Sequence, residues 1–107
     1  MANPDFVEIV LTCASWQEAQ KITDVLLEQH LVACVELVEV KSKNWWQGEL
    51  ENSNEIKLIM QSRVNYFDRI EEVVKKLHSY ETPNLHAMPI VHVTDDVKAW
   101  LEAELYG

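Results

Sequence analysis

The sequence predicts an α+β fold in which four strands and two helices follow the order β-α-β-β-α-β and a third helix closes the chain. Three observations predict it. Short runs rich in β-branched residues are typical of strands, apolar residues at spacings of three and four are typical of helices, and the only internal glycine, Gly48, indicates a hairpin turn. This order is that of the ferredoxin-like split βαβ fold, whose crossovers are right-handed and whose helices lie on one face of the sheet.

The first strand and the first helix are predicted from residues 6–30. Residues 6–12 read FVEIVLT, a short apolar run with the length of a buried strand. Ser15 precedes Glu18 by three residues, which is the spacing of a capping box. Apolar residues then recur at helical spacing, and we expect this helix to end near His30.

Two long strands flank Gly48 and form a hairpin. In residues 32–46 apolar and polar side chains alternate, but the phase changes between Leu37 and Val38, which predicts a bulge or a bend. Residues 49–62 form the return strand. Because a typical strand has about 5–6 residues, the hairpin is expected to protrude beyond the rest of its sheet.

The second half of the chain supplies a helix, an edge strand and a closing helix. Asn65 followed by Asp68 offers a helix start. The apolar stripe of this helix consists of Phe67, Ile70, Val74 and Leu77. Residues 85–93 form the fourth strand, and Pro89 places it at an edge because proline cannot donate to a ladder. Residues 94–105 form the closing helix.

Length, charge and cysteine content limit the class of protein. The 107 residues are expected to form a single domain covering residues 1–107. A net charge of −9 argues against nucleic acid or an anionic membrane as partner, because phosphate binding needs clustered Lys and Arg. No apolar run approaches the roughly 20 residues of a membrane span, and the start MANPDFVEIV does not read as a signal peptide. Cys13 and Cys34 do not suggest a disulfide framework, so a cytoplasmic location is expected.

Trp45 and Trp46 stand side by side just before the hairpin turn. Neighbouring side chains of a strand point to opposite faces, and large exposed apolar groups mark partner surfaces. We expect the partner to be another copy of the chain, because a projecting ribbon also leaves its edges open. The alternative is that both tryptophans fold back onto their own sheet. The phase change in the preceding strand hides which of the two is buried.

Five segments follow one another along the chain: VLTCAS, LLEQHLVACVELV, WWQGELE, LHSYETPNLHAMPI and AWLEAEL. In this order they resemble the CutA proteins, which are named for divalent-cation tolerance. The resemblance implies a tight homotrimer related in fold to the PII signalling proteins, a cytoplasmic location, and a link to copper and other divalent ions, but no reaction. The chain departs from the family pattern at Glu49, Ser79 and Val97, where lysine, proline and tyrosine are usual.

Cys13 and His78 are the candidate metal ligands. Cys13 ends the first strand and His78 ends the second helix, and the CutA resemblance implies that both lie near an intersubunit cleft. A thiolate and an imidazole suit Cu(I), Cu(II) or Zn(II). The alternative is a cysteine used as a small apolar side chain and a histidine that bonds the last carbonyls of its helix, since two ligands do not complete a site. Cys34 lies in an apolar run and is expected in the core.

Tyr80 and Glu81 follow His78 in the segment HSYETP and form a candidate ligand cleft. A phenol and a carboxylate beside an imidazole could coordinate an ion or bind a small ligand. The loop could equally be a structural corner in which Glu81 accepts backbone N–H groups.

No enzyme is expected, because the P-loop, Rossmann, nucleophile-elbow and zincin motifs are missing. Two function classes remain. The first is a homotrimeric protein of metal binding or metal tolerance that uses Cys13 and His78 for copper or another divalent cation, with no obligatory cofactor. The second is a PII-like signalling or scaffold protein that holds a small ligand in intersubunit clefts.

Overall fold

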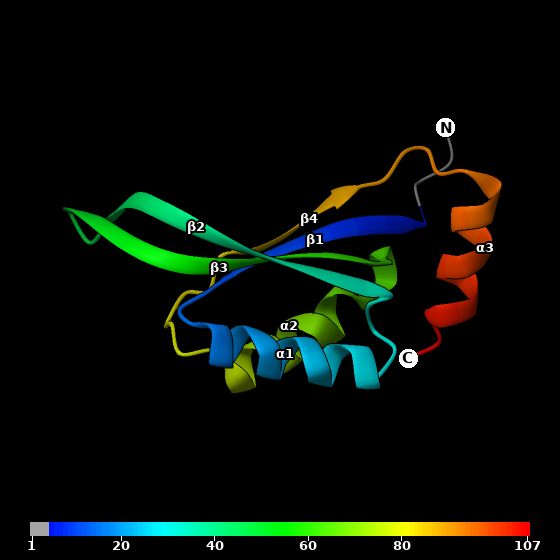
Figure 1. Cartoon of the computed structure of the whole chain (residues 1–107), viewed down its shortest axis with the longest axis horizontal. Helices are drawn as coiled ribbons and strands as arrows, with labels where there is room; N and C mark the ends of the chain where they lie inside the picture. The colour runs from blue at the N-terminus through cyan, green and yellow to red at the C-terminus, as the bar shows by residue number, and fades with distance from the viewer. Residues whose placement is uncertain (1–4) are drawn as a thin grey trace.

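A four-stranded antiparallel sheet, ordered β2-β3-β1-β4, is the framework of the computed structural model, which describes residues 5–107 (Figure 1). The elements are β1 (Phe6–Cys13), α1 (Trp16–Glu28), β2 (Cys34–Trp46), β3 (Glu49–Arg63), a 3-10 turn η1 (Val64–Tyr66), α2 (Phe67–Leu77), β4 (Leu85–Pro89) and α3 (Asp95–Glu104). This order confirms the predicted α+β, ferredoxin-like fold. No helix within residues 5–107 is both long and apolar enough to cross a membrane.

Helices α1 and α2 cover one face of the sheet (Figure 1). Their apolar stripes pack against alternate residues of β1 and β3, because successive strand side chains point to opposite faces. The large side chains that this contact buries almost completely are Ile9, Leu11, Ile22, Leu26, Leu58, Met60, Ile70 and Val74. This core fixes the end of β1, the start of α1 and the end of α2 relative to one another.

The two ends of α1 are held by polar contacts. At the start, the Ser15 hydroxyl accepts the N–H of Glu18 at 3.2 Å, as the capping-box spacing predicted. The helix ends at Glu28, and His30 has a positive φ of 54°. The Tyr106 hydroxyl donates to Nε2 of His30 at 2.7 Å, and the two rings stack with their centroids 3.9 Å apart. The C-terminal segment is therefore tied to the end of α1.

The β2–β3 hairpin keeps one register up to the pair Trp46↔Glu49 at its tip. Of the two alternatives predicted between Leu37 and Val38, a bulge or a bend, the bulge is therefore wrong. Leu37 packs against the core, whereas Val38 points to the other face and is 44% exposed. The apolar pattern changes face because the hairpin leaves the cover of the helices, and no extra residue is inserted.

The hairpin tip projects past α1 and α2 (Figure 1), as predicted from the length of its strands. Gln47 and Gly48 form the turn, with φ values of 50° and 82°. Trp45 is 74% exposed and Trp46 is 37% exposed. Within one chain, Trp45 therefore has little cover and Trp46 has somewhat more.

The second half of the chain departs from prediction at two boundaries. Asn65 lies inside the 3-10 turn, and α2 begins at Phe67 without a side-chain cap, so the predicted cap is wrong. β4 is an edge strand as predicted, but it ends at Pro89 and does not continue to residue 93. Proline has no N–H with which to extend the ladder.

Candidate metal centre

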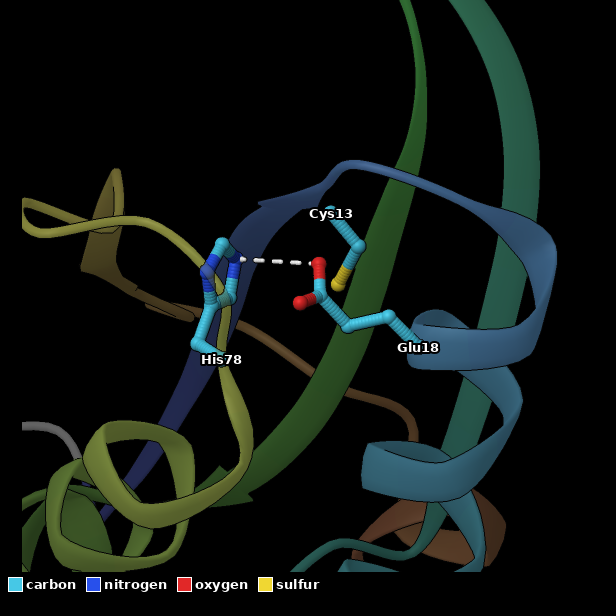
Figure 2. A group of neighbouring side chains, drawn as sticks. All are labelled: Cys13, Glu18 and His78. Atoms are coloured by element: carbon cyan, nitrogen blue, oxygen red, sulfur yellow. Dashed lines mark ion pairs between the residues drawn. The ribbon is translucent and has the colours of Figure 1, made fainter.

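Three side chains from three different elements meet at one end of the sheet (Figure 2). Cys13 is the last residue of β1, Glu18 lies in the first turn of α1, and His78 directly follows α2. One possible ligand atom from each lies within 4.8 Å of the other two. We call this group the triad. The structure brings Cys13 and His78 together as a pair of candidates, and it adds Glu18, which the sequence had indicated only as a helix-capping residue.

Glu18 joins the start of α1 to the loop after α2. One of its carboxylate oxygens accepts the N–H of Ala14 at 2.8 Å, and the other accepts the N–H of Ser79 at 2.6 Å. Burial acts to raise the pKa of Glu18, but these two hydrogen bonds and the neighbouring His78 outweigh it and hold the pKa below its ordinary value. The carboxylate is therefore ionised at neutral pH and can attract a cation.

The imidazole of His78 is completely buried and both of its nitrogens have hydrogen-bond partners. Its Nε2 donates to the carbonyl oxygen of Thr12 at 2.8 Å and lies 3.8 Å from a carboxylate oxygen of Glu18. Its Nδ1 accepts the N–H of Tyr80 at 3.0 Å. The alternative in which His78 bonds the last carbonyls of its own helix is wrong, because the carbonyl that the ring bonds belongs to β1.

The Cys13 side chain is fully buried. Burial, followed by the negative charges of Glu18 and Glu55, raises the pKa of the Cys13 thiol to about 12. In the metal-free protein Cys13 is therefore a neutral thiol that belongs to the buried core and also lies beside Glu18 and His78. A bound cation reverses this preference, since it stabilises the thiolate directly.

A cavity of about 780 Å³ opens beside the triad, and Tyr80 and Glu81 line it. The Tyr80 hydroxyl donates to a carboxylate oxygen of Glu55 at 2.7 Å, and burial together with this carboxylate raises the pKa of Tyr80. Burial acts to raise the pKa of Glu55 too, but hydrogen bonds from Ser42, Tyr80 and Ser53 outweigh it and lower that pKa. Sequence reasoning missed Glu55, because its partner Tyr80 is 25 residues away.

The remaining predicted residues lie outside the triad. Trp46 lines the same cavity as Tyr80, while Trp45 lies near the hairpin tip. Cys34 was expected in the core but is half-buried, and its thiol donates to the side-chain carbonyl of Gln61 at 3.3 Å. Along β2 the core-facing position belongs to the next residue, Val35, which packs against the core.

Residues 7–104 match the family described as CutA1 divalent ion tolerance protein. The chain belongs to the CutA1 family. The divalent-cation tolerance protein CutA of Archaeoglobus fulgidus is 36% identical over 94 residues, which cover 88% of this chain and 92% of the relative. A solved CutA structure from that organism has a TM-score of 0.90 at 34% identity and covers 94% of this chain and 98% of its own. CutA1 from the psychrotrophic bacterium Shewanella sp. SIB1 has a TM-score of 0.92 at 26% identity, covering 99% and 100%.

These CutA1 relatives correct one expectation. The sequence favoured a cytoplasmic location, but the solved CutA from Archaeoglobus fulgidus is described as periplasmic, so that expectation is wrong. Two cysteines without a disulfide between them are compatible with either compartment, because an oxidising compartment permits disulfides without requiring them. The CutA1 relatives are named for divalent-cation tolerance and not for a reaction.

Proposed function

We propose that the protein serves divalent-cation tolerance by binding copper at the triad, as a homotrimer of single-domain subunits and without catalysis. The observation that carries this proposal is the approach of one sulfur, one nitrogen and one carboxylate oxygen to within 4.8 Å of one another. Mixed soft and intermediate ligands suit copper and zinc, whereas calcium and magnesium prefer oxygen alone. Three protein ligands leave a coordination position open, as suits an ion that is taken up and released.

The surroundings of the triad suit a cation that replaces a proton. The ionised carboxylate of Glu18 attracts the ion, and the ion then stabilises the Cys13 thiolate as the thiol proton leaves for solvent. Among divalent first-row metals copper has the highest affinity for such ligands, and a thiolate also suits Cu(I). The backbone N–H groups of Ala14 and Ser79 orient the carboxylate, as outer contacts commonly do at metal sites.

The exposed hairpin supports assembly into a trimer. Trp45 and Leu50 are directly opposed on β2 and β3 and are 74% and 55% exposed. Val38, further along the hairpin, is 44% exposed. A neighbouring copy that covers these side chains would remove a large apolar area from water. Light scattering at micromolar concentration tests this assembly, and a monomer there would contradict it.

A PII-like role in small-ligand signalling is the second candidate, and the cavity beside the triad favours it. A volume of about 780 Å³ lies within the usual range of about 300–1,000 Å³ for small-molecule sites. Tyr80, Trp46 and Glu81 are among the residues that line it. In this candidate function, metal binding is incidental.

Calorimetric titration of the reduced protein separates the two functions. Cu(I) and Cu(II) are titrated in parallel with a panel of nucleotides and metabolites. Cys13→Ala is expected to remove most copper affinity, because it deletes the soft ligand, and His78→Ala should weaken Cu(II) binding more than Cu(I) binding. Cys34→Ala is the matched control, since it deletes the thiol that lies outside the triad. Copper binding in the Cys13→Ala, His78→Ala double variant that equals binding in the parent would disprove the site.

A further inference from the structure

We propose that an ion at the triad reverses the tautomer of His78, releases the backbone of Tyr80, and so reshapes the cavity beside the triad. This switch rests on the proposed metal function, because it requires an ion on His78. It follows from the opposite character of the two neighbours of the ring: a carbonyl oxygen that can only accept, and a backbone N–H that can only donate.

These two neighbours fix the tautomer in the metal-free protein. The proton lies on Nε2, which donates to Thr12, and the lone pair lies on Nδ1, which accepts from Tyr80. Nε2 is also the nitrogen that faces the triad, 3.8 Å from the carboxylate of Glu18 (Figure 2). The nitrogen in position to bind an ion is therefore the one that lacks an available lone pair.

Binding of an ion at Nε2 requires the ring proton to change place. To hold an ion, Nε2 would give its proton to solvent and lose its hydrogen bond to the carbonyl of Thr12. Nδ1 would take up one proton, so the ring would lose no proton overall. Nδ1–H then faces the N–H of Tyr80. Two donors cannot bond each other, and a buried donor left without a partner is unfavourable, so the Tyr80 amide must turn away.

The neighbouring backbone contact depends on the triad as well. The N–H of Ser79 donates to Glu18 at 2.6 Å, so two consecutive backbone N–H groups are held by two prospective metal ligands. On its other side, Tyr80 lines the cavity and donates its hydroxyl to Glu55 at 2.7 Å. A movement of this segment therefore changes the cavity wall. A molecule in the cavity that holds Tyr80 against Glu55 should weaken the binding of the metal. By linkage, the metal weakens the binding of that molecule by the same factor.

Nuclear magnetic resonance of the ¹⁵N-labelled, reduced protein tests the switch, with Zn²⁺ as the probe because it is diamagnetic. Correlations through the imidazole carbons identify the protonated nitrogen of His78, and His86 on β4 serves as an internal reference. Calorimetry on the same sample measures Zn²⁺ binding independently. We expect the proton to move from Nε2 to Nδ1 at saturation. Hydrogen exchange at the Tyr80 amide should accelerate about tenfold, as expected for the loss of one ordinary hydrogen bond.

His78→Asn is the matched variant. The amide oxygen of asparagine can accept the N–H two residues later, as in an Asx-turn, so the contact to Tyr80 is kept while the nitrogen that faces the triad is lost. In this variant, Zn²⁺ should leave exchange at Tyr80 unchanged. An equal response in the variant and the parent would overturn the route through His78.

Two further outcomes separate the switch from the metal function. If Zn²⁺ binds and Cys13→Ala abolishes the binding, but His78 keeps its proton on Nε2 and the Tyr80 amide is unchanged, the switch is wrong and the metal site stands. If Zn²⁺ does not bind, or binds equally to Cys13→Ala, the switch is overturned. The metal function is wrong as well only if the calorimetric titration with copper gives the same result.

Discussion

The triad and the hairpin tip differ in how far their own chain covers their side chains. At the triad, the imidazole of His78 is completely buried, the carboxylate of Glu18 is 10% exposed, and their polar atoms have partners within the chain. At the tip, Trp45 is 74% exposed and the opposing Leu50 is 55% exposed. A single chain buries the side chains of the triad, but it leaves the apolar side chains of the hairpin tip exposed. Changes at the triad should therefore act within a subunit, and changes at the tip should act through assembly.

The largest expected effect is at the tip. Trp45→Ala removes the more exposed of the two indoles, which has the most area for a neighbouring copy to cover. Truncation of a buried aromatic side chain typically destabilises by about 3–5 kcal/mol, and the loss recurs in every subunit. We expect a much lower melting temperature that rises with protein concentration, because folding and assembly become linked. Trp46→Ala should have a milder effect on assembly. Only 37% of Trp46 is exposed within one chain, so less of its area remains for a neighbouring copy to cover.

Trp100→Ala is the control for this experiment. Trp100 is 40% exposed and belongs to α3, which lies at the opposite end of the molecule from the hairpin tip (Figure 1). Its truncation should lower the melting temperature by an amount that does not depend on protein concentration, because its own chain covers most of this indole. If Trp45→Ala behaves like this control, the hairpin tip is not covered by another copy and the contrast between the two regions fails.

Glu18→Gln tests the intramolecular region and should have an intermediate effect. Glutamine keeps one acceptor oxygen but presents an NH₂ group to either Ala14 or Ser79, where only a backbone donor is available. A buried donor without a partner costs about 1–3 kcal/mol. Chemical denaturation should show this loss equally at low and high protein concentration. Glu28→Gln, an exposed change on the same helix, should stay within about 0.5 kcal/mol of the parent.

Glu55 gives a smaller effect that depends on pH. Its pKa in the folded protein is lowered from 4.5, so its contribution to the free energy of unfolding is fully present above pH 4.5 and is lost as the pH falls through the folded-state pKa. Denaturation measured from pH 7 into this acid range should show a steeper decline for the parent than for Glu55→Gln. Parallel profiles would mean that the contacts of Glu55 with Tyr80 and the serines do not favour its ionised form.

The smallest effect is expected at the turn. Gln47 has a φ of 50°, and the next residue, Gly48, has a φ of 82°. Asparagine tolerates this left-handed conformation better than glutamine does. Gln47→Asn should therefore raise the free energy of unfolding by less than about 1 kcal/mol. A loss of stability in chemical denaturation would show that the glutamine side chain makes a compensating contact.

The features predicted correctly depend on local signals. The order of strands and helices follows from apolar periodicity, the cap at Ser15 from a spacing of three residues, and the edge position of β4 from Pro89. Each of these signals acts over a few residues of backbone. A local signal is not always sufficient, because the spacing of Asn65 and Asp68 predicted a helix cap that the structure does not form.

The features that could not be predicted depend on distant partners. The carboxylate of Glu18 bonds the N–H of Ser79, which is 61 residues away, and His78 bonds the carbonyl of Thr12, which is 66 residues away. No spacing within one element encodes these contacts. The predicted bulge failed for a related reason: the change of apolar phase after Leu37 reflects what covers the hairpin, and periodicity alone cannot distinguish that from an inserted residue.

The unbroken register of β2 and β3 also determines the order in which the sheet can form. From the turn at Gly48, each added pair closes a loop only slightly longer than the one before, and hairpins form in about 1–10 μs. The pairing of β1 with β3 joins residues as distant as Phe6 and Arg63, so it must overcome a larger loop entropy. The tip that carries the tryptophans can therefore form before the core does, and in the proposed trimer it would stay exposed until a second copy binds. If the proposed trimer forms, the rate at which subunits associate sets how long this exposed apolar ribbon is open to aggregation.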